Sequence, residues 1–204
     1  MPVNNKTVFC TTREAAQLLG ISLRTAQLWV ESGLLEAWKT DGGHRRIARN
    51  SVEQLLAARP VAGGHAPSGS EGARLRVLVV EDDHVLLKLY KLRIAAWGLP
   101  LELSVAANGY EGLMRIGRET PDLLILDLRM PGMDGFEMLQ TLAYSPFRQG
   151  MEIVVVTGLS QEEISGRGKL PPGVSVLPKP IPFALLREKA EALLAKMELA
   201  ECQN

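Results

Sequence analysis

Three short apolar runs between residues 77 and 156 each end at side chains that carry oxygen. They are residues 77–80 before Glu81 and Asp82, residues 123–126 before Asp127, and residues 154–156 before Thr157. Short runs of leucine and β-branched residues are typical of buried parallel strands. Ligands of an open parallel sheet bind at the carboxyl ends of its strands. The pattern therefore predicts an α/β domain whose polar residues meet at one edge of the sheet.

Lys179 completes this predicted site, because it lies between two prolines just after a further strand-like stretch. The site then has three carboxylates, a hydroxyl and an ammonium group, on Glu81, Asp82, Asp127, Thr157 and Lys179. Carboxylate oxygens suit Mg²⁺, and a lysine beside them suits a phosphoryl anion. The alternative is a set of solvated strand ends and an ordinary surface lysine. Five such residues in this order favour phosphoryl chemistry.

A stretch rich in glycine, proline and serine divides the 204 residues into two modules. We place the first domain at residues 1–59, a flexible linker at 60–73 and the second domain at 74–204. Residues 1–60 carry eight Lys and Arg against five Asp and Glu, a net charge of +3, and the remainder carries −3. A basic module beside an acidic one indicates an anionic partner for the first domain.

Cysteine usage and hydropathy point to the cytoplasm of a cell. Cys10 and Cys202 lie near opposite ends of the chain, without the spacing of a disulfide framework or a zinc site. The first nine residues have no apolar core of a signal peptide, and no apolar run is long enough to span a membrane. We therefore expect a cytoplasmic protein with no membrane partner.

Strand-like and helix-like stretches alternate in the second domain, which is typical of βαβ units and a parallel sheet. The expected strands are residues 75–80, 101–106, 123–127, 153–157 and 174–177. The expected helices are residues 84–97, 110–118, 135–143 and 183–199. Glycines and prolines follow Thr157, so a fourth helix in that stretch is expected to be short.

The first domain begins with two expected helices joined by a tight turn. Thr11 and Glu14 form a capping-box pattern that starts a helix, and Gly20 ends it. Ser22 is placed to cap a second helix that reaches about residue 32. Two helices with a short glycine-containing turn form a helix-turn-helix.

A hairpin and a third helix are expected to follow. Residues 34–39 and 44–48 flank a glycine-rich tip, which predicts the hairpin. Asn50 and Glu53 form a second capping-box pattern, which predicts a helix up to residue 58. We expect Trp29 and Trp38 to pack in the small core of this domain.

The second domain resembles the receiver domain of response regulators, the phospho-acceptor half of bacterial two-component signalling. The motifs VLVVEDD, PDLLILDLRMPGMDG, VVVTG and LPKPI carry the resemblance over nearly the whole domain. It implies a doubly wound, five-stranded parallel sheet of the flavodoxin-like type. It also implies Mg²⁺ as cofactor and a sensor histidine kinase or phosphotransfer protein as partner. Only self-phosphorylation and self-dephosphorylation are then expected, not the turnover of an enzyme.

The same resemblance implies roles for the acidic residues. Asp127 would be the phosphate acceptor, whose carboxylate attacks the phosphorus of a phospho-histidine donor. Asp82 and Asp127 would bind Mg²⁺, with Glu81 acting mainly through water and Arg129 through its backbone carbonyl.

Lys179 would pair with the transferred phosphoryl group, and Thr157 would donate its hydroxyl to that group. One departure concerns the position three residues before the lysine, where receivers commonly have an aromatic residue. Here that position is Val176, which is too small to swing as such a lever. A short, glycine-rich element after Thr157 could instead become ordered on phosphorylation.

The first domain resembles the winged helix-turn-helix of MerR-type regulators and excisionase-like proteins. The stretch TTREAAQLLGISLRTAQLWVESGLL and the wing DGGHRRI carry this resemblance. It implies that the second helix enters the major groove of DNA. The candidate DNA-binding residues are Arg13, Arg24, Thr25, Gln27, His44, Arg45 and Arg46. Arg24 is suited to guanine and Gln27 to adenine, and both are expected to face outward with Thr25.

We therefore expect a bacterial response regulator that is phosphorylated on an aspartate and regulates transcription by binding double-stranded DNA. One such DNA-binding module buries only about 600–1,000 Å², so a homodimer or a side-by-side array on DNA is expected. The main alternative is a phosphorylation-gated adaptor, in which the helix-turn-helix binds a protein partner. A third possibility, a phosphatase, would require turnover of a phosphate ester.

Overall fold

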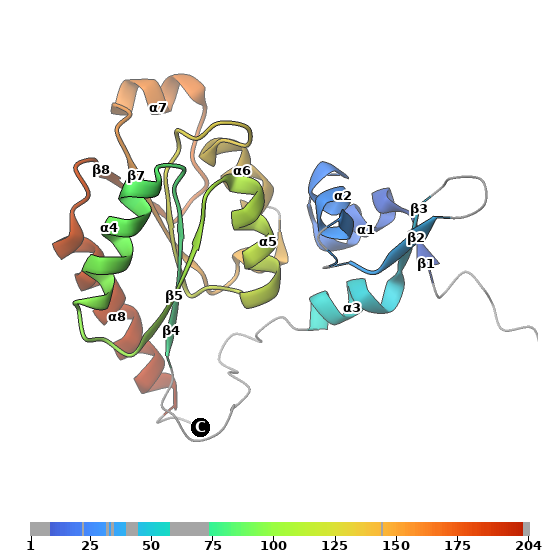
Figure 1. Ribbon diagram of the computed structural model, residues 1–204, viewed down its shortest axis with the longest axis horizontal. Helices are drawn as coiled ribbons and strands as arrows, with labels where there is room; N and C mark the ends of the chain where they lie inside the picture. Colours follow the sequence, from blue (N-terminus) through green and yellow to red (C-terminus); the bar gives the residue numbers. More distant parts are fainter. Residues whose placement is uncertain are drawn as a thin grey trace, which may run out of the picture.

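The computed structural model describes residues 9–21, 23–31, 33, 35–39, 45–57, 74–143 and 145–201. Its first module contains three helices and a small antiparallel sheet (Figure 1). The elements are β1 (Phe9–Cys10), α1 (Thr12–Leu19), α2 (Leu23–Glu31), β2 (Ala37–Lys39), β3 (Arg45–Ala48) and α3 (Arg49–Ala57). The helix-turn-helix and the hairpin that flanks it are therefore both present.

Helix α1 has the caps that its sequence predicts. The Thr11 side chain accepts from the Glu14 amide, and the Glu14 carboxylate accepts from the Thr11 amide at 2.8 Å. Gly20 ends the helix in the left-handed conformation, with φ of 66°. Ser22, the predicted cap of α2, lies outside the described residues. The capping box and the stop at Gly20 are confirmed.

The predicted capping box of the third helix is wrong. Helix α3 begins at Arg49, one residue before the expected cap, so Asn50 lies inside the helix. Glu53 accepts a hydrogen bond from the Arg49 side chain at 3.1 Å, a pair spaced by one helical turn. The Glu53 carboxylate, which the capping-box pattern predicts to bond to the helix N-terminus, thus bonds to the Arg49 side chain.

The hairpin is confirmed, and its tip at residues 40–44 lies outside the described residues. Strand β3 is central, with β1 and β2 antiparallel on either side. Trp38 of β2 is 41% exposed and meets Phe9 edge-on, with ring centroids 4.3 Å apart. The expectation that Trp38 packs in the core is therefore wrong, whereas Trp29 is 1% exposed.

The second module is a five-stranded parallel sheet. Its strands are β4 (Leu75–Val80), β5 (Leu101–Ala106), β6 (Leu123–Leu126), β7 (Glu152–Thr157) and β8 (Val174–Pro178). They lie in the order β5-β4-β6-β7-β8. The chain starts near the middle of the sheet and winds outward in both directions, which is the doubly wound arrangement. All five strands agree with prediction to within one residue.

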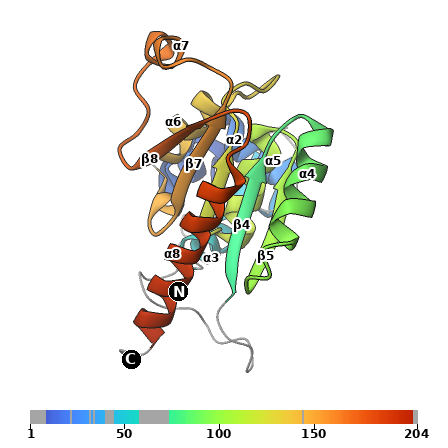
Figure 2. The same cartoon turned by 90° about the vertical axis from the view of Figure 1, so that its left-hand side faces the viewer.

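Helices cover both faces of this sheet (Figures 1 and 2). One face carries α4 (His84–Ala95) and α8 (Phe183–Glu201), and the other carries α5 (Gly109–Glu119) and α6 (Gly135–Ala143). A 3₁₀ turn, η1 (Pro146–Arg148), follows α6. Helix α7 (Gln161–Arg167) has seven residues and is as short as its glycines predict.

Alternating side chains of β4 build the two cores. Val77 and Val79 pack toward α4 and α8, whereas Leu78 and Val80 pack toward α5 and α6. All four are at most 1% exposed. Burial of each such side chain contributes about 1.5–3 kcal/mol, so both layers are needed to hold the strand in place. The carboxyl ends of the strands, below α7 in Figure 1, remain free to present polar residues.

The two modules are in contact through α2 and the α5–α6 side of the sheet. Trp29 of α2 meets Phe147 of η1 edge-on, with ring centroids 5.6 Å apart. Trp29 therefore packs against the second module as well as within its own. A sequence pattern alone could not reveal this second neighbour.

Candidate functional site

The predicted polar residues meet at the carboxyl edge of the parallel sheet. Glu81 and Asp82 follow β4, and Asp127 follows β6, the neighbouring strand. The Asp127 amide donates to the Val80 carbonyl at 3.0 Å, which continues the pairing of these strands to Asp127. Parallel pairing thus brings together carboxylates that are far apart in sequence.

Lys179 reaches this group from β8. Its ammonium Nζ lies 2.7 Å from Asp127 Oδ2 and 2.8 Å from Glu81 Oε2. Its amide donates to the Thr157 carbonyl at 2.8 Å, which holds the base of the side chain beside β7. Burial alone would lower the pKa of Lys179, but the hydrogen bonds to Asp127 and Glu81 outweigh burial and raise it. The lysine is therefore positively charged and bridges both carboxylates.

Glu81 and Asp127 are both buried, with exposures of 2% and 5%. Burial raises the pKa of Glu81, and the hydrogen bond from Lys179 opposes this only in part. Two buried carboxylates side by side repel each other and lose hydration, so they need a cation. Lys179 supplies one positive charge here.

A divalent cation fits the same group of residues. Glu81, Asp82 and Asp127 each offer a carboxylate oxygen, and these oxygens all lie within 4.8 Å of one another. Asp82 is half-buried and takes no part in the pairs with Lys179, so its carboxylate is not neutralised by that lysine. A set of hard oxygen donors with excess negative charge is what Mg²⁺ requires.

The loop after Asp127 shapes one side of the site. The Arg129 amide donates to Asp127 Oδ1 at 3.1 Å and orients the carboxylate. The backbone carbonyl of Arg129, the predicted metal ligand, stays a prediction. Gly132 has φ of +82°, a conformation that residues with side chains rarely adopt, and the chain then returns to α6 at Gly135.

Thr157 and Val176, unlike Glu81 and Asp127, take no part in the ion pairs of Lys179. The Thr157 side chain is 1% exposed, and its hydroxyl accepts from the Leu159 amide at 3.3 Å. It lies at the end of β7, beside the strand that leads to Lys179. Val176 is half-buried in β8 and contributes to the core on the α5–α6 side. The position of the aromatic lever is thus occupied by a packed aliphatic side chain.

One residue of the acidic motif had no predicted role. The Asp83 carboxylate accepts from the amides of Val85 and Leu86, at 2.7 and 3.3 Å, and caps α4. The signal was available in the sequence, since Asp is a preferred cap before an apolar helical stretch. Asp83 therefore fixes the helix that begins beside Asp82, and it is not in the acidic cluster.

The candidate DNA-binding residues are spread over the first module. Arg13, Arg24 and Gln27 are exposed, while Arg45 and Arg46 of β3 are half-buried. Arg45 pairs with Glu31 at 3.2 Å, both being partly exposed. His44 lies outside the described residues.

Thr25 does not face outward as predicted. Thr25 is 1% exposed and lies with Ala26 on the buried side of α2. Leu23 is 43% exposed instead. The prediction that Thr25 contacts DNA is therefore wrong for this structure, because Thr25 lies in the interior.

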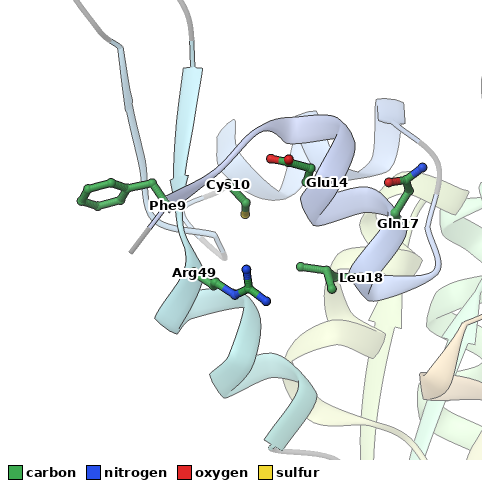
Figure 3. A pocket seen from close by; sticks show the side chains of 6 residues that line it. All are labelled: Phe9, Cys10, Glu14, Gln17, Leu18 and Arg49. Atoms are coloured by element: carbon green, nitrogen blue, oxygen red, sulfur yellow. The ribbon is translucent and has the colours of Figure 1, made fainter. Parts of the chain in front are cut away.

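A shallow hollow of about 300 Å³ lies on the first module, away from the acidic site (Figure 3). Its lining comes from β1, α1 and α3 and mixes apolar with charged side chains: Phe9, Cys10, Glu14, Gln17, Leu18 and Arg49. The Cys10 thiol points to the Ile47 carbonyl at 3.8 Å, and burial raises its pKa. Glu14 and Arg49 are engaged in pairs with Thr11 and Glu53.

The fold is a doubly wound α/β domain, and its acidic site at the carboxyl edge of the sheet offers three carboxylates to a divalent cation. Residues 77–191 match the family of response regulator receiver domains, and residues 9–60 match a family of helix-turn-helix domains. The chain therefore belongs to the response regulator receiver family and carries an N-terminal helix-turn-helix. In the described part of the chain, no helix has the length and apolar character needed to cross a membrane.

Curated relatives of different names match about three fifths of this chain. The chain is 34% identical to the transcriptional activator protein PfeR of Pseudomonas aeruginosa, over 61% of this chain and 39% of PfeR. It is 35% identical to protein-glutamate methylesterase/protein-glutamine glutaminase 5 of Myxococcus xanthus, over 62% of this chain and 36% of that protein. The chain thus matches well under half the length of both relatives. Similarity in the receiver domain therefore does not determine what the rest of a response regulator does.

A solved structure agrees with this fold. The CheY-like response regulator receiver domain protein from Methanospirillum hungatei JF-1 is 30% identical, with a TM-score of 0.50. The similarity covers 62% of this chain and 98% of that one. The second module is thus equivalent to a complete receiver domain.

Proposed function

We propose that Asp127 accepts a phosphoryl group from a sensor histidine kinase or a phosphotransfer protein, and that this modification controls binding of the helix-turn-helix to double-stranded DNA. The observation that carries the first half is the bridge from Lys179 to Asp127 and Glu81. A buried carboxylate with a lysine within hydrogen-bond distance is already arranged for an incoming anion. The second half rests on the helix-turn-helix and its exposed Arg13, Arg24 and Gln27.

We expect the phosphoryl transfer to use these side chains in the following way. A carboxylate oxygen of Asp127 attacks the phosphorus of the phospho-histidine, a phosphorus–oxygen bond forms, and the phosphorus–nitrogen bond breaks. The electron pair of the broken bond goes to the imidazole nitrogen, which leaves as neutral histidine after taking up a proton. Lys179 then exchanges its contact with Asp127 for one with a phosphoryl oxygen, and Thr157 turns its hydroxyl toward the same group.

Mg²⁺ bound by Asp82 and Asp127, with Glu81 nearby, would neutralise charge on the phosphoryl oxygens. The fit of these carboxylates supports this cofactor. The Arg129 amide keeps the Asp127 carboxylate in a fixed orientation during the transfer.

Labelling with a small phosphoryl donor tests the first half directly. The full chain would be incubated with phosphoramidate and MgCl₂, and the modified residue located by mass spectrometry after borohydride trapping. We expect one modification, at Asp127, which is absent in Asp127→Asn and absent with EDTA. Asp134→Asn is the matched control, because Asp134 lies in the same loop and an asparagine can still cap α6. Labelling of Asp134 or of no residue would contradict the proposal.

Selection from a randomised double-stranded oligonucleotide library tests the second half. The full chain would be used with and without beryllium fluoride and Mg²⁺, which together imitate the phosphoryl group. We expect an enriched sequence whose recovery changes with the mimic, and loss of enrichment in Arg24→Ala. Enrichment that is indifferent to the mimic would contradict control by phosphorylation, and no enrichment in either state would contradict DNA binding. The self-association expected on DNA, as a dimer or array, is measured in the same samples by sedimentation.

A second candidate function is an adaptor in which the first module binds a protein. Exposed apolar side chains on that module favour it: Phe9, Leu18, Leu23 and Trp38 are 37–43% exposed. Phe9 and Leu18 also line the hollow of Figure 3. Loss of function in Trp38→Ala, without any change in library selection, would favour the adaptor. Either function places the protein in the cytoplasm, where two-component kinases deliver phosphoryl groups.

A further inference from the structure

Helix α5 of the receiver lies against α2, the helix that we propose to read DNA (Figure 1). The Arg24 guanidinium of α2 lies over the ring of Tyr110 in α5, 5.0 Å from its centroid. The second contact is that of Trp29 with Phe147, at 5.6 Å between ring centroids. Both contacts join the two modules, so one side of α2 is already occupied.

This occupied side is incompatible with major-groove binding. A helix in the groove lies between two phosphate backbones in a space about 12 Å wide. A second helix packed against α2 would take the place of one backbone. The exposed guanidinium of Arg24 in addition lies over an aromatic face, so the ring of Tyr110 competes with a base for it. While α5 is packed against α2, this side of α2 is therefore closed to a DNA backbone. Separation of the two modules would open it, and neither module would have to unfold.

Tyr110 also borders the loop that begins at the acceptor. The loop is residues 128–134, and a Cβ built on Gly132 would lie 3.8 Å from Cε2 of Tyr110. A Cβ on Gly109 would lie 2.8 Å from the Met133 carbonyl oxygen, so the start of α5 touches the loop backbone. At its other end the loop donates the Arg129 amide to Asp127. One loop thus bonds to Asp127 and lies beside Tyr110, the residue that holds Arg24.

We propose that the receiver masks α2 in the unmodified protein, and that the loop 128–134 carries modification of Asp127 to Tyr110 and so releases Arg24 and Trp29. This rests on the proposed function, since the mask matters only if α2 binds DNA. Phosphorylation adds about −1.5 to −2 units of charge where the Arg129 amide and Lys179 now contact a carboxylate. A shift of that loop acts on Tyr110 directly.

The test uses the full chain and variants on the receiver side, so that the DNA-reading residues stay intact. Tyr110→Ala removes the ring that holds Arg24, and Tyr110→Phe keeps it. Arg93→Ala is the matched control, because it removes a similar pair, Arg93 over Phe183 at 5.2 Å, on the opposite face of the sheet. Each protein is examined with and without beryllium fluoride and Mg²⁺.

Two independent measurements are made on each protein. The first is retention of the randomised double-stranded oligonucleotide library at low salt. The second is the emission of Trp29 in a Trp38→Phe and Trp97→Phe background, which reports whether Trp29 has left Phe147. We expect Tyr110→Ala without the mimic to raise DNA retention by about twofold to fivefold and to shift the emission to the red. Tyr110→Phe and Arg93→Ala are expected to match the wild type, and the mimic to reproduce the effect of Tyr110→Ala.

The outcomes separate this inference from the function on which it rests. Trp29 emission that responds neither to Tyr110→Ala nor to the mimic would overturn the mask. DNA retention that is measurable but equal in all variants and states would also overturn it, while leaving DNA binding intact. An emission shift without DNA retention in any state would support release of α2 and overturn DNA as its partner.

Discussion

Gly135 and Asp127, the proposed phosphate acceptor, approach so closely that no side chain fits between them. A Cβ on Gly135 would overlap the Asp127 carbonyl oxygen and would lie 2.7 Å from Cα of Leu128. The Gly135 amide donates to the Leu128 carbonyl at 3.1 Å and closes the loop at this point. The start of α6 therefore fixes the backbone that carries the acceptor.

Gly135→Ala is expected to displace that backbone, because both neighbours are main-chain atoms that cannot turn aside. We expect a loss of about 1–3 kcal/mol in the free energy of unfolding and slower labelling of Asp127 by phosphoramidate. Gly158→Ala is the control, since a Cβ there meets nothing within 4 Å and the residue also lies near the site. Urea denaturation and the labelling rate check this, and equal behaviour of the two variants would contradict the constraint.

Lys179→Gln should destabilise the metal-free protein, because Glu81 and Asp127 would then be buried without a cation. We expect a loss of about 3 kcal/mol in the free energy of unfolding, and recovery of part of it when MgCl₂ is added. Lys189→Gln is the matched control, since its pair with Glu152 is more exposed and is worth under about 1 kcal/mol. A stability that Mg²⁺ does not raise in Lys179→Gln would argue against a metal site at these carboxylates.

The ion pair of Arg76 with Asp122 ties β4 to the start of β6, at the edge of the sheet opposite the site. The Asp122 carboxylate accepts from the Arg76 amide at 2.8 Å and from its guanidinium at 3.1 Å. Asp122→Ala leaves these donors without a charged partner and should cost about 1.5–3 kcal/mol in unfolding free energy. Labelling of Asp127 should continue at the rate of the wild type in the folded protein. A slower labelling rate would show that this pair also positions the acceptor.

Glu14 should titrate below its ordinary value of 4.5, because hydrogen bonds from the Thr11 backbone and side chain lower its pKa. A lowered pKa in the folded state contributes stability above the unfolded pKa, and this contribution is lost as pH falls through the folded pKa. In Thr11→Ala the backbone bond remains, so we expect the Glu14 pKa to rise toward 4.5 without reaching it. The variant should lose about 1 kcal/mol of stability at neutral pH. Carboxyl chemical shifts from NMR between pH 2 and pH 7 measure this; an unchanged Glu14 pKa would show that the side-chain bond contributes nothing.

Local sequence patterns predicted the elements of the receiver closely. The strand of residues 75–80 and the helix of residues 135–143 have the predicted bounds, because the apolar run of the strand stops at Glu81 and Gly135 marks the start of the helix. The capping box at Thr11 is also local, since its two partners are three residues apart. The pattern failed at Asn50, where a pair from Arg49 to Glu53 competes for the same carboxylate.

Side chains that contact distant parts of the chain were predicted less well. Thr25 was expected to face outward and is buried, and Trp38 was expected in the core and is exposed. A polar or aromatic residue on a short helix or strand can lie on either side, and the tertiary neighbours decide which side is covered.

The sequence by itself determined the parallel sheet and the gathering of Glu81, Asp82, Asp127 and Lys179, because parallel strands bring their carboxyl ends to one edge whatever surrounds them. Only the tertiary structure decided that Lys179 bridges Glu81 and Asp127, and that Arg24 lies on Tyr110. Those relationships depend on side-chain reach and on the docking of one module against another. Neither side-chain reach nor module docking can be predicted from the periodicity of a sequence, because contacts between surfaces depend on their shape and charge in three dimensions.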